Sequence, residues 1–199
     1  MSRRALGCLL ELVETLLVVV VLFLVVQLFV AQPYQIQQTS MENTLMPGQY
    51  VLVDKLTPHF DDYHRGDIVV FNPPTGWADP SGTPYIKRVI GVAGDTIDIH
   101  GGRVYLNGAL LKEPYVVPGE TTDMMDGGSK TWTLKNDELF VMGDHRQESQ
   151  DSRDFGPISR SSVIGRAWIR YWPASAFGLV PQAKQQPSPS GSPVPSTTP

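Results

Sequence analysis

The sequence is poor in the residues that metal sites and disulfide frameworks need. Of its 199 residues, one is a cysteine and four are histidines. The histidines are scattered and form no H-x-x-x-H pair, and a single cysteine can form neither an internal disulfide nor a CxxC cluster. These shortages argue against a disulfide-stapled mini-domain and against a zinc enzyme.

Positive charge is also scarce, with 16 Lys and Arg against 20 Asp and Glu and a net charge of −4. A protein that binds nucleic acid through a broad surface needs an excess of basic residues, so we expect no nucleic-acid partner. Hydrophobic residues make up 41% of the chain, which is enough for a folded core. The mean hydropathy of −0.12 hides a strong asymmetry along the chain.

No charged residue occurs between Glu14 and Glu42, and residues 15–31 read TLLVVVVLFLVVQLFVA. A helix from Leu12 to Ala31 would span roughly 30 Å, the thickness of a bilayer core. Lipid offers no partners to backbone amides, so such a segment must be helical. The sequence therefore predicts one N-terminal transmembrane helix.

The charges on either side of this helix predict its orientation. Arg3 and Arg4 precede it, and no Lys or Arg follows until Lys55. The positive-inside rule then places the N-terminus in the cytoplasm and the rest of the chain outside, in a single-pass topology. A cleaved signal peptide is the alternative, but the apolar run is long and residues 31–33 (AQP) make a poor cleavage site, which favours a retained anchor.

Composition divides the chain into three parts. Residues 181–199 read PQAKQQPSPSGSPVPSTTP, a tract that cannot bury enough apolar surface to fold and is expected to be a disordered tail. We therefore expect the cytoplasmic N-terminus and anchor at residues 1–34, an extracytoplasmic β-rich domain at 35–180, and the tail at 181–199.

The middle part is expected to be mainly β, because short runs of β-branched residues are bounded by Pro and Gly. The expected strands are residues 50–53, 67–71, 85–90, 96–100, 103–106, 138–142 and 163–172. Gly101-Gly102 and Asn107-Gly108 are typical of two-residue hairpin turns. Beyond the anchor, the sequence contains no helical period of 15 residues.

A lysine within an apolar strand is the first candidate for chemistry. The histidines lie in loops, at a strand end or in a polar run, where none is well placed to act as a base. A lysine can replace histidine when burial lowers its pKa by several units. Lys87 lies between apolar residues of the strand at 85–90. Most strand lysines instead extend to water, so this pattern alone leaves both interpretations open.

Two polar runs accompany this strand. Residues 35–45 place Ser40 just beyond the anchor, and residues 141–153 are dense in hydrogen-bonding groups directly after an apolar strand. A solvated loop would explain that density equally well.

Four segments behind the anchor resemble, in order, the sequence boxes of the bacterial type I signal peptidases, the membrane-anchored Ser-Lys endopeptidases of peptidase family S26. They are PYQI at 33–36 with Ser40-Met41 and Thr44-Leu45; GDIVVF at 66–71; YIKRVIG at 85–91 with Gly94-Asp95; and GDHR at 143–146 with Ser149, DSR at 151–153 and Gly156. The resemblance extends from the anchor to about Trp172. It implies a β-rich catalytic domain behind one transmembrane helix.

The resemblance also implies roles for individual residues. Ser40 is the expected nucleophile, Lys87 the general base kept neutral by burial, and Ser149 the residue that orients the Lys87 amine. The Ser40 N–H is the expected first oxyanion donor, with Gln38 or Thr39 as candidates for the second. The expected charge-paired scaffold comprises Asp144, Arg146, Asp151 and Arg153. The expected apolar substrate pockets are lined by Tyr34, Ile36, Met41, Leu45, Tyr85 and Ile86.

The implied activity is cleavage of signal peptides from secreted preproteins after a small residue, in Ala-x-Ala sites, with no metal or organic cofactor. The implied partners are preproteins and the lipid bilayer, and the implied location is the outer face of the bacterial cytoplasmic membrane. Two alternatives stay open: a related Ser-Lys maturation protease with a narrower substrate, and a catalytically inactive, membrane-tethered β-domain that binds exported chains.

Three positions depart from the family's usual pattern. Asn43 stands where proline is usual, which predicts a less rigid turn after the nucleophile. Gln38 stands where serine or glycine is common, which leaves the second oxyanion donor open. His145 replaces the commoner asparagine after Gly-Asp and is expected to keep its polar role.

Overall fold

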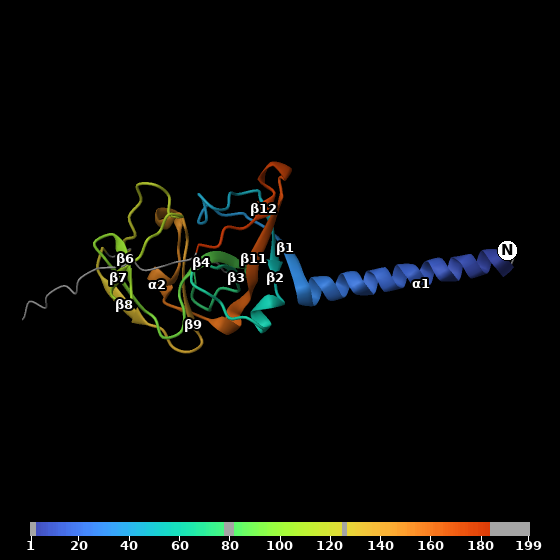
Figure 1. Ribbon diagram of the computed structural model, residues 1–199, viewed down its shortest axis with the longest axis horizontal. Helices are drawn as coiled ribbons and strands as arrows, with labels where there is room; N and C mark the ends of the chain where they lie inside the picture. Colours follow the sequence, from blue (N-terminus) through green and yellow to red (C-terminus); the bar gives the residue numbers. More distant parts are fainter. Residues whose placement is uncertain (1–2, 78–81, 125–126, 184–199) are drawn as a thin grey trace, which may run out of the picture.

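The computed structural model describes residues 3–77, 82–124 and 127–183 of the chain. Helix α1 (Arg3–Val25) projects away from the folded domain and continues into a π-helical turn, η1 (Val26–Val30) (Figure 1). Residues Leu10–Val30 are long and apolar enough to cross a membrane, and the most apolar window of this segment is not buried inside the folded domain. This segment fits the expected membrane anchor.

The helix passes directly into the first sheet, because strand β1 (Ala31–Gln35) begins immediately after η1 and pairs with β2 (Tyr50–Asp54). Lys55, the residue after β2, forms hydrogen bonds to this junction through its backbone and its side chain. Its N–H donates to Val30 O at 2.9 Å, and its Nζ donates to Leu28 O at 2.7 Å. Lys55 thereby satisfies carbonyl groups that a helix end leaves without partners.

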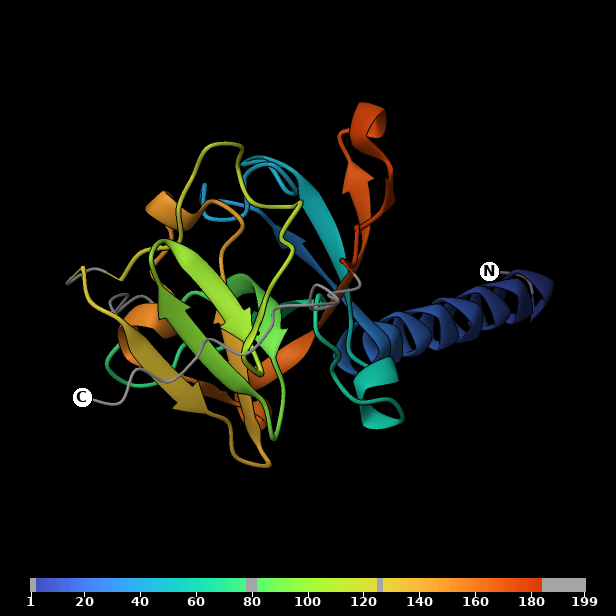
Figure 2. The same cartoon turned by 60° about the vertical axis from the view of Figure 1, so that its left-hand side comes forward.

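The larger sheet has eight antiparallel strands and contains the elements nearest the helix (Figure 1). Its order is β1, β2, β11 (Val163–Trp172), β3 (Ile68–Phe71), β4 (Tyr85–Gly91), β9 (Glu138–Met142) and β10 (Ile158–Ser159). Strand β12 (Gly178–Leu179) pairs with β11, and this hairpin projects beside the domain (Figure 2).

The smaller sheet lies on the side of the domain away from α1 (Figure 1). Its order is β7 (Ala109–Leu110), β6 (Arg103–Leu106), β5 (Thr96–His100) and β8 (Lys130–Thr133). The expected hairpin between β5 and β6 is confirmed: Gly101 and Gly102 both have positive φ, at 55° and 72°, a region that glycine enters without a steric penalty.

The mainly β class and every strand expected from the sequence are confirmed, and the remaining helices are short. They are η2 (Thr57–His59), η3 (Arg146–Glu148), α2 (Ser152–Phe155), η4 (Arg160–Ser162) and η5 (Ala174–Ala176). Strand β1 was not expected, because Pro33 lacks an N–H and the strand follows an apolar run. An edge strand tolerates such a proline.

The ends of the folded domain differ from the expected boundaries. Residues 31–34 pair within the larger sheet, so the sheet starts inside the segment assigned to the anchor. At the other end, the Gln182 side chain accepts a hydrogen bond from Ile68 N at 2.8 Å and donates to Ala167 O at 2.7 Å. The start of the expected tail is therefore bonded to the domain, and residues 184–199 of that tail lie outside the described residues.

Strand β4 is buried on both faces because hydrophobic clusters cover each side of it. Ile90 packs with the smaller sheet, and Val89 packs in a separate cluster with Val69 and Val141. A third cluster, which contains Met41 and Leu45, lies under the turn that follows β1. Polar side chains on β4 are therefore withdrawn from solvent.

Candidate active site

Ser40 and Lys87 are in direct contact although 47 positions separate them in the chain. Ser40 begins the turn at residues 40–45, and Lys87 lies on β4. Lys87 Nζ is 2.5 Å from Ser40 Oγ, which is hydrogen-bond distance. Both side chains are shielded from bulk water, with 4% of Ser40 and 1% of Lys87 exposed.

Burial lowers the pKa of the Lys87 ammonium from its usual 10.5 to about 8, because the charged form loses its hydration. The carboxylates of Asp151 and Asp144 act in the opposite direction, and the Arg153 guanidinium adds to the lowering. Asp151 and Asp144 each have an arginine partner, so burial prevails. The amine is thereby brought into the range in which a lysine can accept a proton at neutral pH.

Ser149 lies close to the dyad but bonds elsewhere. Its Oγ donates to Asp151 Oδ2 at 2.7 Å, so the hydrogen bond that the structure shows goes to Asp151 and not to the Lys87 amine. Gly143 separates Ser149 from the Ser40 backbone, and a Cβ at that position would overlap both Ser149 Oγ and Ser40 O. The segments that carry Ser40, Gly143 and Ser149 therefore meet at a point where only glycine fits.

Asp151 organises the loop that carries Ser149. Burial acts to raise the pKa of its carboxyl, but the Arg153 charge and the hydrogen bonds from Arg153, Ser149 and Gly143 outweigh burial and lower it. Arg153 Nε donates to Oδ1 at 2.9 Å, and Gly143 N donates to Oδ2 at 3.0 Å. Asp151 also caps helix α2 in a capping box with Asp154. This carboxylate stays ionised and fixes the loop.

Asp144 and Arg146 are charge-paired, but with partners that the sequence did not reveal. Asp144 accepts from Arg88 Nε at 2.8 Å and Arg88 Nη2 at 2.7 Å, and it accepts from Thr44 Oγ1 at 2.5 Å. Arg146 pairs with Glu113 at 2.5 Å. Arg88 could have been found, because an arginine in a buried strand requires a carboxylate partner. Glu113 lies in a loop and gives no such signal.

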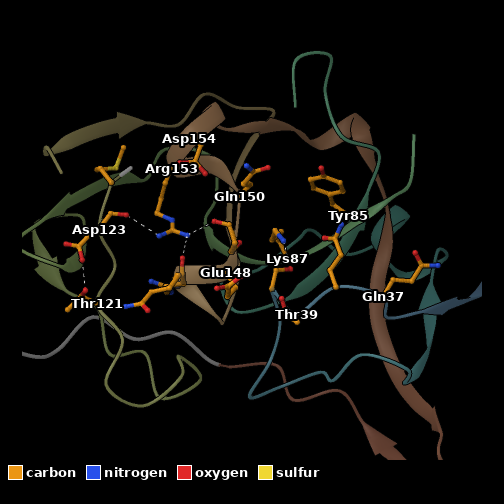
Figure 3. Close-up of a pocket in the computed structure, with 16 residues that line it drawn as sticks. Gln37, Thr39, Tyr85, Lys87, Thr121, Asp123, Glu148, Gln150, Arg153 and Asp154 are labelled. Atoms are coloured by element: carbon orange, nitrogen blue, oxygen red, sulfur yellow. Dashed lines mark hydrogen bonds between the residues drawn. The ribbon is translucent and has the colours of Figure 1, made fainter. Parts of the chain in front are cut away.

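A cavity of about 770 Å³ opens beside the dyad (Figure 3). At one end, Gln37, Thr39 and Tyr85 lie around Lys87, and the cavity continues past Gln150 toward Arg153 and Asp154 (Figure 3). Gln38 and Thr39, the two candidates for the second oxyanion donor, both line this wall.

Of the six expected pocket residues, Tyr85 lines the cavity. Met41, Leu45 and Ile36 are buried in the core cluster under the turn, and Tyr34 and Ile86 are half-buried against that cluster. The turn directs its apolar side chains inward, where burying them stabilises the fold. In this structure these five residues support the wall of the site and Tyr85 forms part of it.

Asn43 forms hydrogen bonds that connect its turn, which was predicted to be less rigid, to a neighbouring loop. Its backbone has φ 79°, in the left-handed region, which asparagine tolerates and proline cannot adopt. Its Nδ2 donates to Tyr115 O at 3.0 Å and to Val116 O at 3.3 Å. The looser turn stays a prediction, and these side-chain hydrogen bonds supply a restraint at the position where a proline ring is usual.

His145 also contacts the turn. Its backbone N–H donates to Ser40 O at 3.1 Å. Its ring lies between two carboxylates, with Nδ1 3.2 Å from Glu42 Oε2 and Nε2 2.9 Å from Glu120 Oε1. The expected polar role of His145 is thus that of a bridge between the turn and a second loop.

Within the described parts of the chain, no group of three or more His, Cys, Asp or Glu side chains could hold a metal ion. The expectation of a site without a metal or an organic cofactor stays a prediction.

Known proteins resemble this chain over most of its length. Residues 9–172 match the family described as signal peptidase, peptidase S26. A signal peptidase I from Leptolyngbya laminosa is 38% identical, over 85% of this chain and 83% of its own. One from Bacillus licheniformis is 33% identical, over 86% of this chain and 93% of its own. A crystal structure of a signal peptidase I from Enterococcus faecalis V583 is 30% identical, covers 53% of this chain and 97% of its own, and has a TM-score of 0.43. The chain belongs to the signal peptidase family, peptidase S26, and is a serine endopeptidase of signal-peptide processing.

Proposed function

We propose that this protein cleaves secretory signal peptides with Ser40 as the nucleophile and the neutral amine of Lys87 as the general base. The observation that carries the proposal is the 2.5 Å contact between Lys87 Nζ and Ser40 Oγ inside a buried site. With the pKa of Lys87 lowered to about 8, about one molecule in ten holds the neutral amine at pH 7. A Ser-Lys pair needs this form, because only the free amine accepts the serine proton.

The reaction then follows from the positions of the two side chains. Ser40 Oγ attacks the scissile carbonyl carbon while Lys87 takes its proton. The oxyanion is stabilised by the Ser40 N–H and by a second donor from Gln38 or Thr39, and each such donor contributes about 3 kcal/mol. The Lys87 ammonium gives its proton to the leaving amine. The free amine next takes a proton from water as the water oxygen bonds to the acyl carbon, and the ammonium so formed returns this proton to Ser40 Oγ as the ester bond breaks.

Supporting residues keep the dyad in place without touching the reacting atoms. Ser149 is bonded to Asp151, and Asp151 to Arg153, which fixes the loop beside the amine. Asp144 is bonded to Arg88, the neighbour of Lys87 on β4. We assign Ser149 the role of orienting Lys87 through this loop.

Small residues before the cleaved bond, as in Ala-x-Ala sites, suit this geometry. The nucleophile is 4% exposed, so a peptide carbonyl must enter deeply between residues 37–39 and Tyr85 to reach it. Large side chains next to that carbonyl would keep it away from Ser40 Oγ. A peptide in an extended conformation can pair its backbone with the chain at residues 37–39 and at Tyr85, on the two sides of the entry to Ser40.

We further propose that α1 anchors the protein in the bacterial cytoplasmic membrane, with the N-terminus inside and the catalytic domain outside. Ser40 follows the helix end by nine residues, from Ala31, which keeps it within about 30 Å of the bilayer surface. A signal peptide held in the same bilayer presents its cleavage site at that height. Preproteins and lipid are therefore the proposed partners.

The test uses the full-length protein in lipid vesicles with a preprotein that has an Ala-x-Ala site. We expect wild type to cut at that site, and Ser40→Ala and Lys87→Ala to lose activity by more than about a thousandfold. Lys135→Ala is the matched control, because Lys135 is exposed and is not among the residues that line the cavity. Normal cleavage by either dyad variant would disprove the mechanism.

A panel of preproteins separates the remaining alternatives. Cleavage of one substrate alone would favour a maturation protease of narrower specificity. Binding without any cleavage would favour a tethered binding domain.

A further inference from the structure

The turn at residues 40–45, called here the nucleophile turn, makes few backbone hydrogen bonds of its own. Thr44 N and Leu45 N both donate to Met41 O, at 3.1 and 2.8 Å, and Glu42 N donates to Thr39 O at 2.8 Å across Ser40. Met41 and Leu45 hold it from below through the core. Ser40 is the first residue of the turn, and contacts from neighbouring loops add to the bond between Glu42 N and Thr39 O in fixing its position.

We propose that Asn43 and His145 are positioning residues that clasp the nucleophile turn to the loop between β7 and β8 and so hold Ser40 Oγ against Lys87. This inference rests on the function proposed above. It assigns to two residues that depart from the family pattern a role in the reaction beyond general polarity.

Asn43 makes the first attachment of the clasp. Its carboxamide nitrogen donates to two successive carbonyl groups of that loop, Tyr115 O and Val116 O. The positive φ of 79° is what turns the side chain toward the loop. Both features are needed, because a residue restricted to negative φ would change the path of the chain three residues after the nucleophile.

His145 makes the second attachment, on the other side of Asn43. Its backbone N–H holds the Ser40 carbonyl, and its ring lies between Glu42 of the turn and Glu120 of the same loop. Glu120 also accepts a hydrogen bond from Arg146 N at 2.7 Å, which fixes the carboxylate. The His145 and Glu120 side chains are 19% and 9% exposed, so this contact is largely shielded from solvent.

The His145 ring is also what separates two carboxylates. Glu42 and Glu120 face its opposite nitrogen atoms. The ring is 3.2 Å from the Glu42 carboxylate and 2.9 Å from the Glu120 carboxylate, so it fills the space between them. Removing the ring leaves two like charges with nothing between them, which pushes the nucleophile turn away from the loop.

The clasp matters for the rate and not for substrate affinity. The cavity wall beside the dyad is formed by residues 37–39 and Tyr85, none of which belongs to the clasp. A loosened turn would therefore bind peptide normally but hold Ser40 Oγ within reach of Lys87 for a smaller fraction of the time. Misplacement of a reacting group lowers kcat because the productive geometry is lost.

The first experiment compares Asn43→Gly with Asn107→Gly. Glycine accepts positive φ, so the substitution removes the carboxamide and spares the backbone. Asn107 is a matched control: it has φ 52°, and its side chain bonds Asp95 and Thr96 N in the smaller sheet. We expect Asn43→Gly to lower kcat about tenfold with KM within about twofold, and the control to keep both values. An unchanged kcat, or a rise in KM alone, would overturn the proposal.

The second experiment tests the position of the His145 ring between Glu42 and Glu120, by asking whether a second substitution restores activity. It tests the proposal even if Asn43→Gly does not fold. His145→Ala should lower kcat about tenfold, and Glu42→Gln added to it should restore a large part of the loss by removing one of the two facing charges. His100→Ala, on a surface histidine that stacks on Tyr105, is the control. Absence of rescue, or an equal loss in the control, would contradict the bridge.

Ser40→Ala and Lys87→Ala are measured in the same series. If these variants cut normally, the proposed mechanism fails. If they are inactive while the Asn43 and His145 variants cut normally, only the clasp fails.

Discussion

Arg88 and Asp144 form a two-point ion pair, at 2.8 and 2.7 Å, one residue along β4 from Lys87. Successive residues of a strand point to opposite faces, so Arg88 and Lys87 extend to different sides of β4. The pair is nevertheless part of the electrostatics of the amine, because Asp144 is one of the carboxylates that raise the pKa of Lys87. Arg88 compensates that charge and thereby helps to keep the amine neutral.

Arg88→Lys should therefore move the pH dependence of the reaction. A lysine keeps one positive charge but cannot make the two-point contact, so more of the Asp144 charge acts on Lys87. We expect the pKa seen in the pH profile of kcat/KM to rise, and the rate at pH 7 to fall severalfold. The control is Arg65→Lys, which weakens the analogous pair with Asp95 at the edge of the smaller sheet. A profile that stays in place in the Arg88 variant would contradict this account.

The wild-type reaction should slow as the pH falls through about 8. Below the lowered pKa of Lys87, the fraction of neutral amine falls tenfold for each pH unit, and kcat/KM should follow it. Above pH 8 the rate should level off. Initial rates on a peptide substrate between pH 6 and 10 measure this, and a rate that is flat down to pH 6 would rule out the neutral amine as the base.

Lys87→Met should give a more stable but inactive protein. The folded pKa of about 8 lies below the usual 10.5, so between these values the unfolded chain binds more protons and stability rises with pH. Below pH 8 the full cost of burying the ammonium remains, about 3 kcal/mol. We expect a gain of this order in the unfolding free energy at pH 7, measured with urea, which shrinks at pH 10.

Lys135→Met is the comparison for that experiment, because Lys135 is exposed and its substitution should change stability little. If Lys87→Met is no more stable than wild type at pH 7, burial of the Lys87 ammonium does not destabilise the folded protein, and the prediction fails.

Gly143→Ala should push apart the segments that carry Ser40, residue 143 and Ser149. The added Cβ would overlap the Ser40 carbonyl and Ser149 Oγ, and the first of these is backbone that cannot rotate away. We expect a loss of about 1–3 kcal/mol in stability and at least a hundredfold fall in kcat. Gly178→Ala is the control, since a Cβ at Gly178 meets nothing within 4 Å. Thermal melting and peptide cleavage measure the two effects.

The strands could be predicted because their signal is local. Strands β9 and β11 begin and end at the expected residues, and the hairpin of β5 and β6 follows from its two glycines. Ser40 and Lys87 were singled out by resemblance, and the contact between them depends on pairing between distant strands. Lys87 alone carried a weak signal, because a strand pattern does not show which lysine is covered on both faces.

The partners in the site could not be predicted, for a physical reason. Glu113 reaches Arg146 from a loop with no periodic pattern, so nothing in the sequence places the two together. Met41 and Leu45 were expected in the pockets and lie in the core, because an irregular turn has no repeat that distinguishes inward from outward side chains. The hydrogen bonds of Asn43 could not be predicted, since they depend on where the neighbouring loop lies.

The junction held by Lys55 has a consequence for how the enzyme could meet its substrate. Since β1 starts at Ala31, directly after η1 ends at Val30, no linker residue separates the helix from the sheet. A tilt of α1 is transmitted through one short strand to Ser40. With α1 in the bilayer, as proposed above, the junction sets the height of Ser40 above the lipid, and lengthening the junction is expected to move the cut along the substrate.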